Sequence, residues 1–322
     1  MKVAIINKAL KLKEVTFFLL ILNSMLFAQE FKNNATAGFT FLQIPTTARV
    51  AALGEAAITL SDMNSEGMFS NPAIIGFTNY THSFSASYSN WFADIKHYGS
   101  SYSYNSPIGV IGAGFVLLDY GTMQRTVRAP GQKVFSVLGE FKANAISAGI
   151  TYSKMLTDRF SFGVSFKYVQ EKIDIYSADN LLFDAGVLYY TGFHSLRLAA
   201  TIQNFGTNTK FINDEFKMPS TFKLGAAAEV LGDFESEYRA TLIFEASHPN
   251  NADERVNIGT ELCWKNIITL RGGYKFFYDE ETYSFGLGLN PQLEVPFNVD
   301  FAFSDYGKLG NIMRFTLQLG MY

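Results

Sequence analysis

Residues able to do acid–base, nucleophilic or metal chemistry are few and scattered in this 322-residue sequence. It has four histidines, His82, His97, His194 and His248, and a single cysteine, Cys263. No two histidines have a metal-binding spacing such as His-x-x-x-His, and one cysteine cannot build a zinc ribbon. No Gly-rich phosphate loop occurs either. We therefore expect no metal site and no cofactor.

A serine hydrolase is the enzyme alternative, and it requires Ser, His and an orienting group side by side. His82 and His97 have serine neighbours, but serine is abundant throughout that part of the chain. Chance proximity explains these pairs better than a catalytic arrangement does. We expect a protein without enzymatic activity.

The first 28 residues predict the compartment in which the protein works. Four lysines precede an apolar run from Val15 to Phe27, a pattern typical of a secretory signal peptide. The run is too short to cross about 30 Å of hydrocarbon as a helix. We predict cleavage after Ala28 and export of the remaining chain.

Charge and hydropathy narrow the class of the exported chain. Removing residues 1–28 leaves 22 of the 26 basic and 28 of the 29 acidic residues, a net charge of −6. A nucleic-acid partner is not expected, because phosphate binding needs a basic surface. No later segment has 18 consecutive apolar residues. That excludes a helical membrane protein and leaves a soluble β protein or a transmembrane β-barrel.

Strict alternation of apolar and polar residues recurs after residue 80. One example has Phe160, Phe162, Val164, Phe166 and Tyr168 alternating with Arg159, Ser161, Gly163, Ser165 and Lys167. One face of such a strand is apolar and aromatic, and the other is small, polar or charged. A soluble sandwich exposes long charged side chains, whereas a face of Gly, Ser and Ala suits a crowded, hydrated interior. Strands of about ten residues also match a tilted membrane crossing.

The pattern predicts an all-β fold: a 14-stranded antiparallel transmembrane barrel in the bacterial outer membrane, surrounded by its lipids. The predicted strands are 82–92, 94–105, 108–119, 141–154, 159–173, 180–191, 194–205, 219–230, 237–247, 254–264, 266–277, 281–290, 297–305 and 311–322. With both termini in the periplasm, the longest connections, Tyr120–Glu140 and Gly206–Met218, fall outside, as an even strand count requires.

Residues 38–79 precede the strands and are apolar without alternating. A lumen of fourteen strands is too wide for wall side chains to fill, so it holds water or other parts of the chain. We predict that residues 29–79 form an N-terminal segment with a hatch inside the barrel of residues 80–322. Ala48–Leu60 could form a short helix in it. The alternative is a periplasmic lead-in without function.

The residues FLQIPTTARVAALGEAAITLSDMNSEGMFSNPA, from Phe41 to Ala73, carry a family resemblance. They resemble the N-terminal signature of the PorV/PorQ family, which is related to the FadL-type fatty-acid channels. Asn71, Pro72 and Ala73 match the Asn-Pro-Ala motif of the lumen hatch in that family, and Arg49 matches the start of the signature. The likeness continues in LRLAATIQNFG, MPSTFKLGAA, LRGGYKF and SFGLGL.

The resemblance implies two different functions. PorV-like members serve type IX protein secretion by binding translocon components or secreted cargo proteins, which we take as the main hypothesis. FadL-like members conduct hydrophobic small molecules, which we keep as the alternative. A channel needs an apolar pocket and a break in the wall, for which paired glycines such as Gly272 and Gly273 are candidates. Glycines that make room for a hatch are the commoner explanation.

Two groups of charged residues are candidate binding determinants. In the connection Tyr120–Glu140, Arg125, Arg128 and Lys133 form a possible partner loop. The predicted inward face carries both signs, which favours ion pairs that hold a hatch over a selectivity ring of one sign. These inward charges are Arg159, Lys167, Arg197, Lys223, Glu229, Arg239, Glu245, Glu261, Arg271, Lys275, Asp300 and Arg314.

Overall fold

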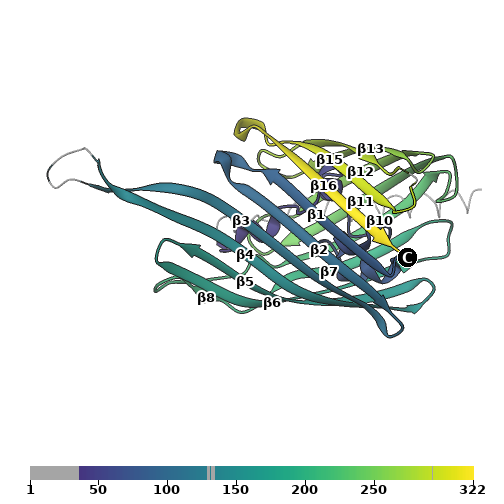
Figure 1. Ribbon diagram of the computed structural model, residues 1–322, viewed down its shortest axis with the longest axis horizontal. Coiled ribbons are helices and arrows are strands. Elements are labelled where there is room, and N and C mark those ends of the chain that lie inside the picture. Colours follow the sequence, from purple (N-terminus) through teal and green to yellow (C-terminus); the bar gives the residue numbers. More distant parts are fainter. Residues whose placement is uncertain (1–35, 129–130, 132–134, 292) are drawn as a thin grey trace, which may run out of the picture. The chain divides into compact units, whose positions relative to one another are not determined.

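The computed structural model describes residues 36–128, 131, 135–291 and 293–322 (Figure 1). The predicted signal peptide, residues 1–28, and Lys133 of the possible partner loop lie outside the described residues. Within the described ranges, no helix is long and apolar enough to cross a membrane.

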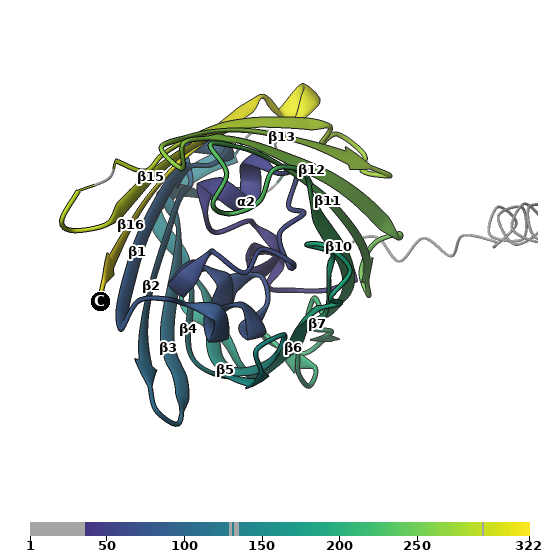
Figure 2. The same cartoon turned by 90° about the vertical axis from the view of Figure 1, so that its right-hand side faces the viewer.

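Fourteen antiparallel strands form a closed barrel, which confirms the predicted fold class (Figure 2). In ring order from β1 they pair with their neighbours in sequence, and β1 pairs with β16 to close the ring. The strands are β1 (His82–Asn90), β2 (Lys96–Ser106), β3 (Gly109–Arg128), β4 (Phe135–Thr157), β5 (Phe160–Ile173), β6 (Tyr176–Tyr190), β7 (Arg197–Phe205), β10 (Thr221–Leu231), β11 (Tyr238–Pro249), β12 (Arg255–Trp264), β13 (Ile268–Phe276), β14 (Tyr283–Leu289), β15 (Phe297–Asp305) and β16 (Asn311–Met321).

The two faces of the wall follow the alternation in the sequence. In β1, Phe84 and Tyr88 are each 41% exposed on the outer face, whereas Ser83 and Ser85 are buried on the lumen side. Exposed large apolar side chains occur on nearly every strand. This outer surface suits acyl chains, because apolar groups lose nothing by leaving water for hydrocarbon.

The connection between the third and fourth strands differs from its prediction as a loop. β3 and β4 continue through it as a paired hairpin, with Thr122 opposite Lys142 and Arg128 opposite Phe135. This hairpin projects beyond the other strands (Figure 1). Thr122, Thr126, Val127, Phe135 and Val137 are β-branched or aromatic residues, which favour extended pairing, so the two strands continue beyond the barrel wall. We call this end of the barrel the long-hairpin end and the opposite one the C-terminal end.

The connection between β7 and β10 contains a small hairpin of β8 (Thr209–Lys210) and β9 (Glu215–Phe216). The start of the described chain is attached to it at the long-hairpin end. The backbone nitrogen of Gly38 donates to the carbonyl of Lys217 at 3.1 Å, and the Phe39 ring stacks on Phe211. This connection therefore folds over the lumen.

Residues 40–77, which we call the inner segment, lie inside the ring of strands (Figure 2). They form η2 (Thr40–Gln43), α2 (Ala48–Ala52), η3 (Asn64–Phe69) and η4 (Pro72–Phe77); η5 (Phe92–Asp94) and η6 (Gly307–Leu309) lie between strands. The predicted helix Ala48–Leu60 was wrong in length. It ends at Ala52 because Gly54 and Glu55 adopt left-handed backbone angles, with φ of 62° and 68°.

Glycines on the lumen face provide the space into which the inner segment fits. A Cβ at Gly273 would lie 2.0 Å from the backbone nitrogen of Gly54, and one at Gly286 would lie 2.4 Å from the Cβ of Ala52. The neighbouring Gly272 points away, with its nearest contact at 3.8 Å. These glycines therefore allow close packing and do not mark a break in the wall.

Candidate functional site

In the described part of the chain, cavities lie between the inner segment and the barrel wall, and three of them bear on function. The C-terminal cavity has a volume of about 710 Å³ and is lined by charged residues, among them Arg49, Asp62 and Arg239. At the other end, a hairpin-end cavity of about 300 Å³ lies beside Trp91 and Tyr306. A wall cavity of about 120 Å³ adjoins strands from β3 to β12. Buried apolar residues of the inner segment, including Leu53, Ile58 and Ile74, fill the space between the two ends.

The Asn-Pro-Ala motif fastens the inner segment to β4, β5 and β6. The amide of Asn71 donates to the carbonyls of Ile58 and Val187 at 3.0 and 3.1 Å, and its oxygen accepts from the nitrogen of Ala73. Ser161 donates to the carbonyl of Ala73 at 2.9 Å. The single side chain of Asn71 thus both caps η4 and attaches it to the wall.

Pro72 completes the motif by its contact with a glycine of β5. A Cβ at Gly163 would lie 2.3 Å from the carbonyl carbon of Pro72, and one at Gly186 would lie 2.0 Å from Oδ1 of Asn71. The proline is at the first position of η4, where its missing N–H costs nothing. In the described part of the chain, the contacts of the motif therefore attach the inner segment to the barrel wall.

Arg49 is not near the motif but binds the opposite side of the wall. Its guanidinium contacts Asp62 at 2.9 Å and Glu261 at 2.8 Å. Arg271 binds the same Glu261 at 2.6 Å and reaches Asp300. Two residues of the inner segment and three of β12, β13 and β15 thus form one chain of ion pairs.

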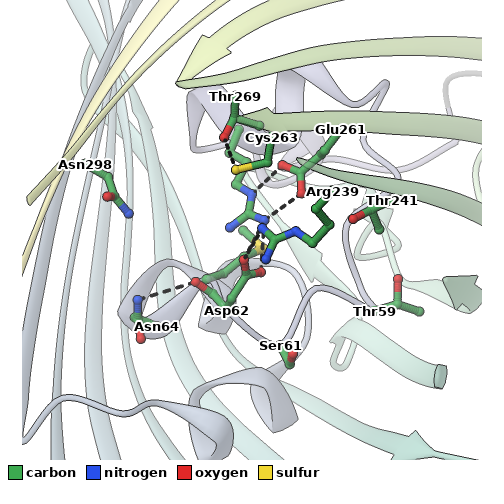
Figure 3. A network of polar contacts seen from close by, with 12 residues as sticks. Thr59, Ser61, Asp62, Asn64, Arg239, Thr241, Glu261, Cys263, Thr269 and Asn298 are labelled. Atoms are coloured by element: carbon green, nitrogen blue, oxygen red, sulfur yellow. Dashed lines mark hydrogen bonds and ion pairs between the residues drawn. The ribbon is translucent and has the colours of Figure 1, made fainter. Parts of the chain in front are cut away.

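Figure 3 shows Asp62, Arg239 and Glu261 directed into the same space, with Cys263 and Thr269 beside them. Arg239 lies 3.9 Å from Asp62 and 4.5 Å from the centre of the Phe234 ring. The hydroxyl of Thr269 donates to the sulfur of Cys263 at 3.4 Å. We call Arg49, Asp62, Arg239, Glu261, Arg271 and Asp300 the C-terminal network, which carries three positive and three negative charges.

The pKa values of two carboxyl groups of the inner segment, Asp62 and Glu66, are shifted in opposite directions. Burial by itself would raise the pKa of Asp62, but the charge of Arg49 outweighs burial, and the pKa is lowered from its ordinary value. Burial raises the pKa of Glu66 to about 8, and the nearby charge of Asp300 adds to the rise. Glu66 is therefore mostly protonated at neutral pH, and the network keeps its equal number of charges.

The wall cavity lies beside an irregularity between β6 and β7. Gln203 and Asn204 of β7 stand opposite the single residue Asp184 of β6, which makes a β-bulge. Asp184 accepts from the backbone nitrogen of Asn204 at 2.7 Å, and Lys167 binds Asp184 at 2.7 Å. An apolar side of the cavity is provided by Phe41, Leu42, Ile44, Val50, Met68 and Phe69.

The residues of the possible partner loop lie on the projecting hairpin. Arg125 is 45% exposed and binds Asp174 in the turn between β5 and β6 at 2.5 Å. Arg128 is exposed at the end of β3. Exposed apolar residues accompany them, including Phe135 and Leu138 at 68% and 64%. The hairpin therefore presents basic and apolar groups together.

The histidines do not come together. His82 stacks on Tyr102 and Tyr104, His97 is buried on the lumen face of β2, and His248 binds Glu254 at the surface. His194 lies in the turn before β7. No cluster of three or more metal-ligating side chains occurs in the described part of the chain.

Sequence reasoning recognised the inward charges of the wall, and among them both members of the pairs Arg197–Glu229 and Lys223–Glu245, but not the partners that the inner segment supplies. Glu55 and Asp62 come from the inner segment, where no alternation shows which side chains face the wall. Phe39 and Phe41 also went unrecognised as the residues that pack beneath the connection of residues 206–218. An aromatic pair next to the glycine at position 38 is the only signal of that contact.

The closed ring of fourteen antiparallel strands, apolar outside and polar inside, defines an outer-membrane β-barrel. The protein is located in the bacterial outer membrane. No protein-family profile matches the chain, and no curated protein matches it significantly in sequence.

Solved structures show the particular type of barrel. The Ralstonia pickettii toluene transporter TbuX has a TM-score of 0.59 at 11% identity, over 86% of this chain and 98% of that one. The Pseudomonas putida toluene transporter TodX has a TM-score of 0.58 at 14% identity, over 85% and 96%. A Pseudomonas aeruginosa FadL homologue has a TM-score of 0.56 at 11% identity, over 86% and 98%. The chain has the fold of FadL-type barrels.

Proposed function

We propose that the protein is a passive, non-enzymatic channel for small hydrophobic molecules across the outer membrane, with the long-hairpin end outside the cell. The observation that carries this proposal is the wall cavity, which joins an apolar side to the bulge between β6 and β7. The fold shared with two toluene transporters and a FadL homologue supports it.

The size of the wall cavity limits the molecules it takes. Its volume of about 120 Å³ is close to that of an engineered protein cavity of about 150 Å³ that binds benzene. Phe41, Met68 and Phe69 contact a guest of this size on one side, and Lys167 and Asp184 face it on the other. The substrate class is a molecule of about one aromatic ring.

Passage requires movement of the inner segment, because its buried apolar residues separate the cavities at the two ends. The bulge gives a second route through the wall. Asp184 and Asn204 hold it together by one hydrogen bond and by Lys167, which binds both side chains at 2.7 and 2.6 Å. Few contacts thus need to break for the wall to open here.

Uptake of radiolabelled toluene tests the proposal, in cells that lack their own hydrophobic channels. Val116→Trp fills the wall cavity from β3, and Leu117→Trp places the same ring on the outer face. We expect uptake with the wild-type barrel and with Leu117→Trp, and background uptake with Val116→Trp. The proposal would be contradicted if cells with the wild-type barrel took up toluene no faster than cells without it.

A second function, the binding of translocon or cargo proteins in type IX secretion, is favoured by the projecting hairpin. Its β3 and β4 segments beyond Tyr120 and before Lys142 pair only with each other, so both outer edges are free for another strand. Its exposed apolar residues and arginines fit a protein surface.

Affinity isolation from outer membranes tests this second function. A variant in which residues 122–141 are replaced by a two-residue turn is the matched control, because it keeps the barrel wall. Specific partners recovered with the wild type and lost with the variant would support secretion. Recovery of the barrel alone would leave passage of small molecules as the single function.

A further inference from the structure

A buried arginine at the long-hairpin end has no counter-charge in contact with it. Arg314 of β16 is 1% exposed, and none of its three guanidinium nitrogens has a hydrogen-bond partner among the described residues. Its guanidinium carbon lies 5.8 Å from the centre of the Trp91 ring. A cation–π contact at that distance is weaker than the cost of burying a charge, so the ring does not compensate for it.

Two more buried polar side chains lie next to Arg314 on the lumen face. Ser89 of β1 is opposite Arg314 on one side and opposite His97 of β2 on the other. The Ser89 hydroxyl and both ring nitrogens of His97 also have no partner among the described residues. Directly opposed side chains on one face have Cβ atoms about 5 Å apart. Three unpartnered polar groups therefore meet at one place.

The lumen-facing side chains two residues away, Ser87 and Thr316, both have hydrogen-bond partners. The unpartnered groups of Arg314, Ser89 and His97 therefore do not reflect loose packing of the wall. Ser87 donates to the carbonyl of Thr46 at 2.7 Å, and Thr316 donates to Ser87 at 3.0 Å. Thr316 in turn accepts from the nitrogen of Ala48 at 2.8 Å. The inner segment thus provides partners two residues away and none at Arg314.

The positive charges in the lumen around Arg314 outnumber the carboxylates there by one. The carboxylates whose charge reaches Arg314 are Glu55 and Glu281, and both bind the ammonium of Lys275. Arg255 also acts on these two carboxylates, and Lys223 acts on Glu55 but is paired with Glu245. Three cations, Lys275, Arg255 and Arg314, therefore face two carboxylates.

We propose that Arg314, Ser89 and His97 form a site for one small monovalent inorganic anion, such as chloride. Each supplies a donor: the guanidinium, the hydroxyl, and one N–H of the neutral imidazole. None of the three lines a cavity described above, and Ala302 and Leu118 flank them in register. Because these three residues and the flanking Ala302 and Leu118 are all buried, the proposal is for a single-atom anion and not for an organic acid. Trp91 and Tyr306 of the hairpin-end cavity adjoin the site.

Crystals of the full protein grown in sodium bromide instead of chloride test the site by anomalous diffraction. We expect a bromide peak within hydrogen-bond distance of Arg314 in the wild type. Arg314→Gln removes the charge, and Arg128→Gln removes an exposed arginine as the matched control. The peak should persist in Arg128→Gln and disappear in Arg314→Gln. A wild-type crystal with no anomalous peak there, or with density for water only, would overturn the proposal even if Arg314→Gln does not fold.

Thermal unfolding gives an independent measurement in solution. At equal ionic strength, the midpoint should be higher in sodium chloride than in sodium gluconate for the wild type and for Arg128→Gln, because gluconate is too large for the site. Arg314→Gln should show no such difference. Equal midpoints of the wild type in the two salts would contradict the proposal. Neither result depends on whether the barrel conducts hydrophobic molecules.

Discussion

The two charged regions of the lumen differ in where their partners come from. In the C-terminal network, Arg49 and Asp62 of the inner segment bind each other and link to Glu261 and Arg271 of the wall. Around Arg314 the inner segment offers only backbone contacts in the neighbouring row. The wall pairs some of its own lumen charges, as Arg197 does with Glu229 and Lys223 with Glu245, but Arg314 has neither a wall carboxylate nor an inner-segment carboxylate in contact. The wall by itself does not pair all of its charges.

Breaking the C-terminal network should have the largest effect. Glu261→Gln removes the carboxylate that binds both Arg49 and Arg271 and leaves two buried guanidiniums underneutralised. We expect a loss of about 3–5 kcal/mol in the free energy of unfolding, measured by urea titration in detergent. Glu237→Gln, at an exposed pair with Lys265, is the control and should cost under about 1 kcal/mol. Equal losses in both variants would refute the network's role.

The titration of Glu66 sharpens the comparison, because this acid adjoins the network without belonging to it. Its pKa is raised from 4.5 to about 8 in the folded protein. The folded state therefore holds a proton that the unfolded state has released. Stability should be full below pH 4.5 and fall as pH rises toward about 8, by at most about 1.4 kcal/mol per pH unit.

Glu66→Gln should remove that part of the pH dependence, because glutamine does not titrate. The measurement is the unfolding free energy at pH 5, 6, 7 and 8 for both proteins. Identical slopes in the wild type and Glu66→Gln would show that Glu66 is ionised in the folded state. An unpaired negative charge would then lie beside the network.

Two adjacent glycines allow a test of how tightly the inner segment is seated. Gly273→Ala places a methyl group 2.0 Å from the backbone nitrogen of Gly54, whereas Gly272→Ala meets nothing closer than 3.8 Å. We expect a loss of about 1–3 kcal/mol for Gly273→Ala, typical of overpacking, and little change for Gly272→Ala. Protease sensitivity of the inner segment in each variant would report its displacement. Two variants that behave alike would contradict this packing.

An exposed ion pair gives the reference for small effects. Arg125 and Asp174 brace the projecting hairpin, with side chains 45% and 27% exposed. Arg125→Gln should reduce the unfolding free energy by about 0–1 kcal/mol, and less at high salt, because solvent screens the pair. A loss as large as that of Glu261→Gln would mean that exposure does not govern the strength of these pairs.

The strands of the barrel can be predicted from the sequence, and outside the long hairpin most of their ends fall within a few residues of the observed ones. The period of two places Phe84 and Tyr88 outside and Ser83 and Ser85 inside, as observed. The strand count and the pairing of β1 with β16 follow from the number of such segments. The hairpin strands were mistaken for a loop because they break the strict alternation of apolar and polar residues, as at Gln124–Arg125 and at Val137–Leu138.

The contacts of the inner segment could not be predicted from the sequence to the same degree. Asn71 was recognised through a motif, but its bonds to Val187 and Ile58 depend on a fold in which no periodicity shows direction. Arg49 and Glu261 are 212 residues apart, and nothing in either neighbourhood indicates the other. The alternation gives the face on which Arg314, Ser89 and His97 lie, whereas only the register brings them together.

The chain enters the lumen at Gly38, attached to Lys217 at one end, and leaves it at the opposite end to begin β1 at His82. It therefore runs the whole length of the bore before the first strand starts. A finished ring offers no way to pull so long a stretch through, since polypeptides seldom thread closed loops. We therefore expect the seam between β1 and β16 to close after this stretch is in position.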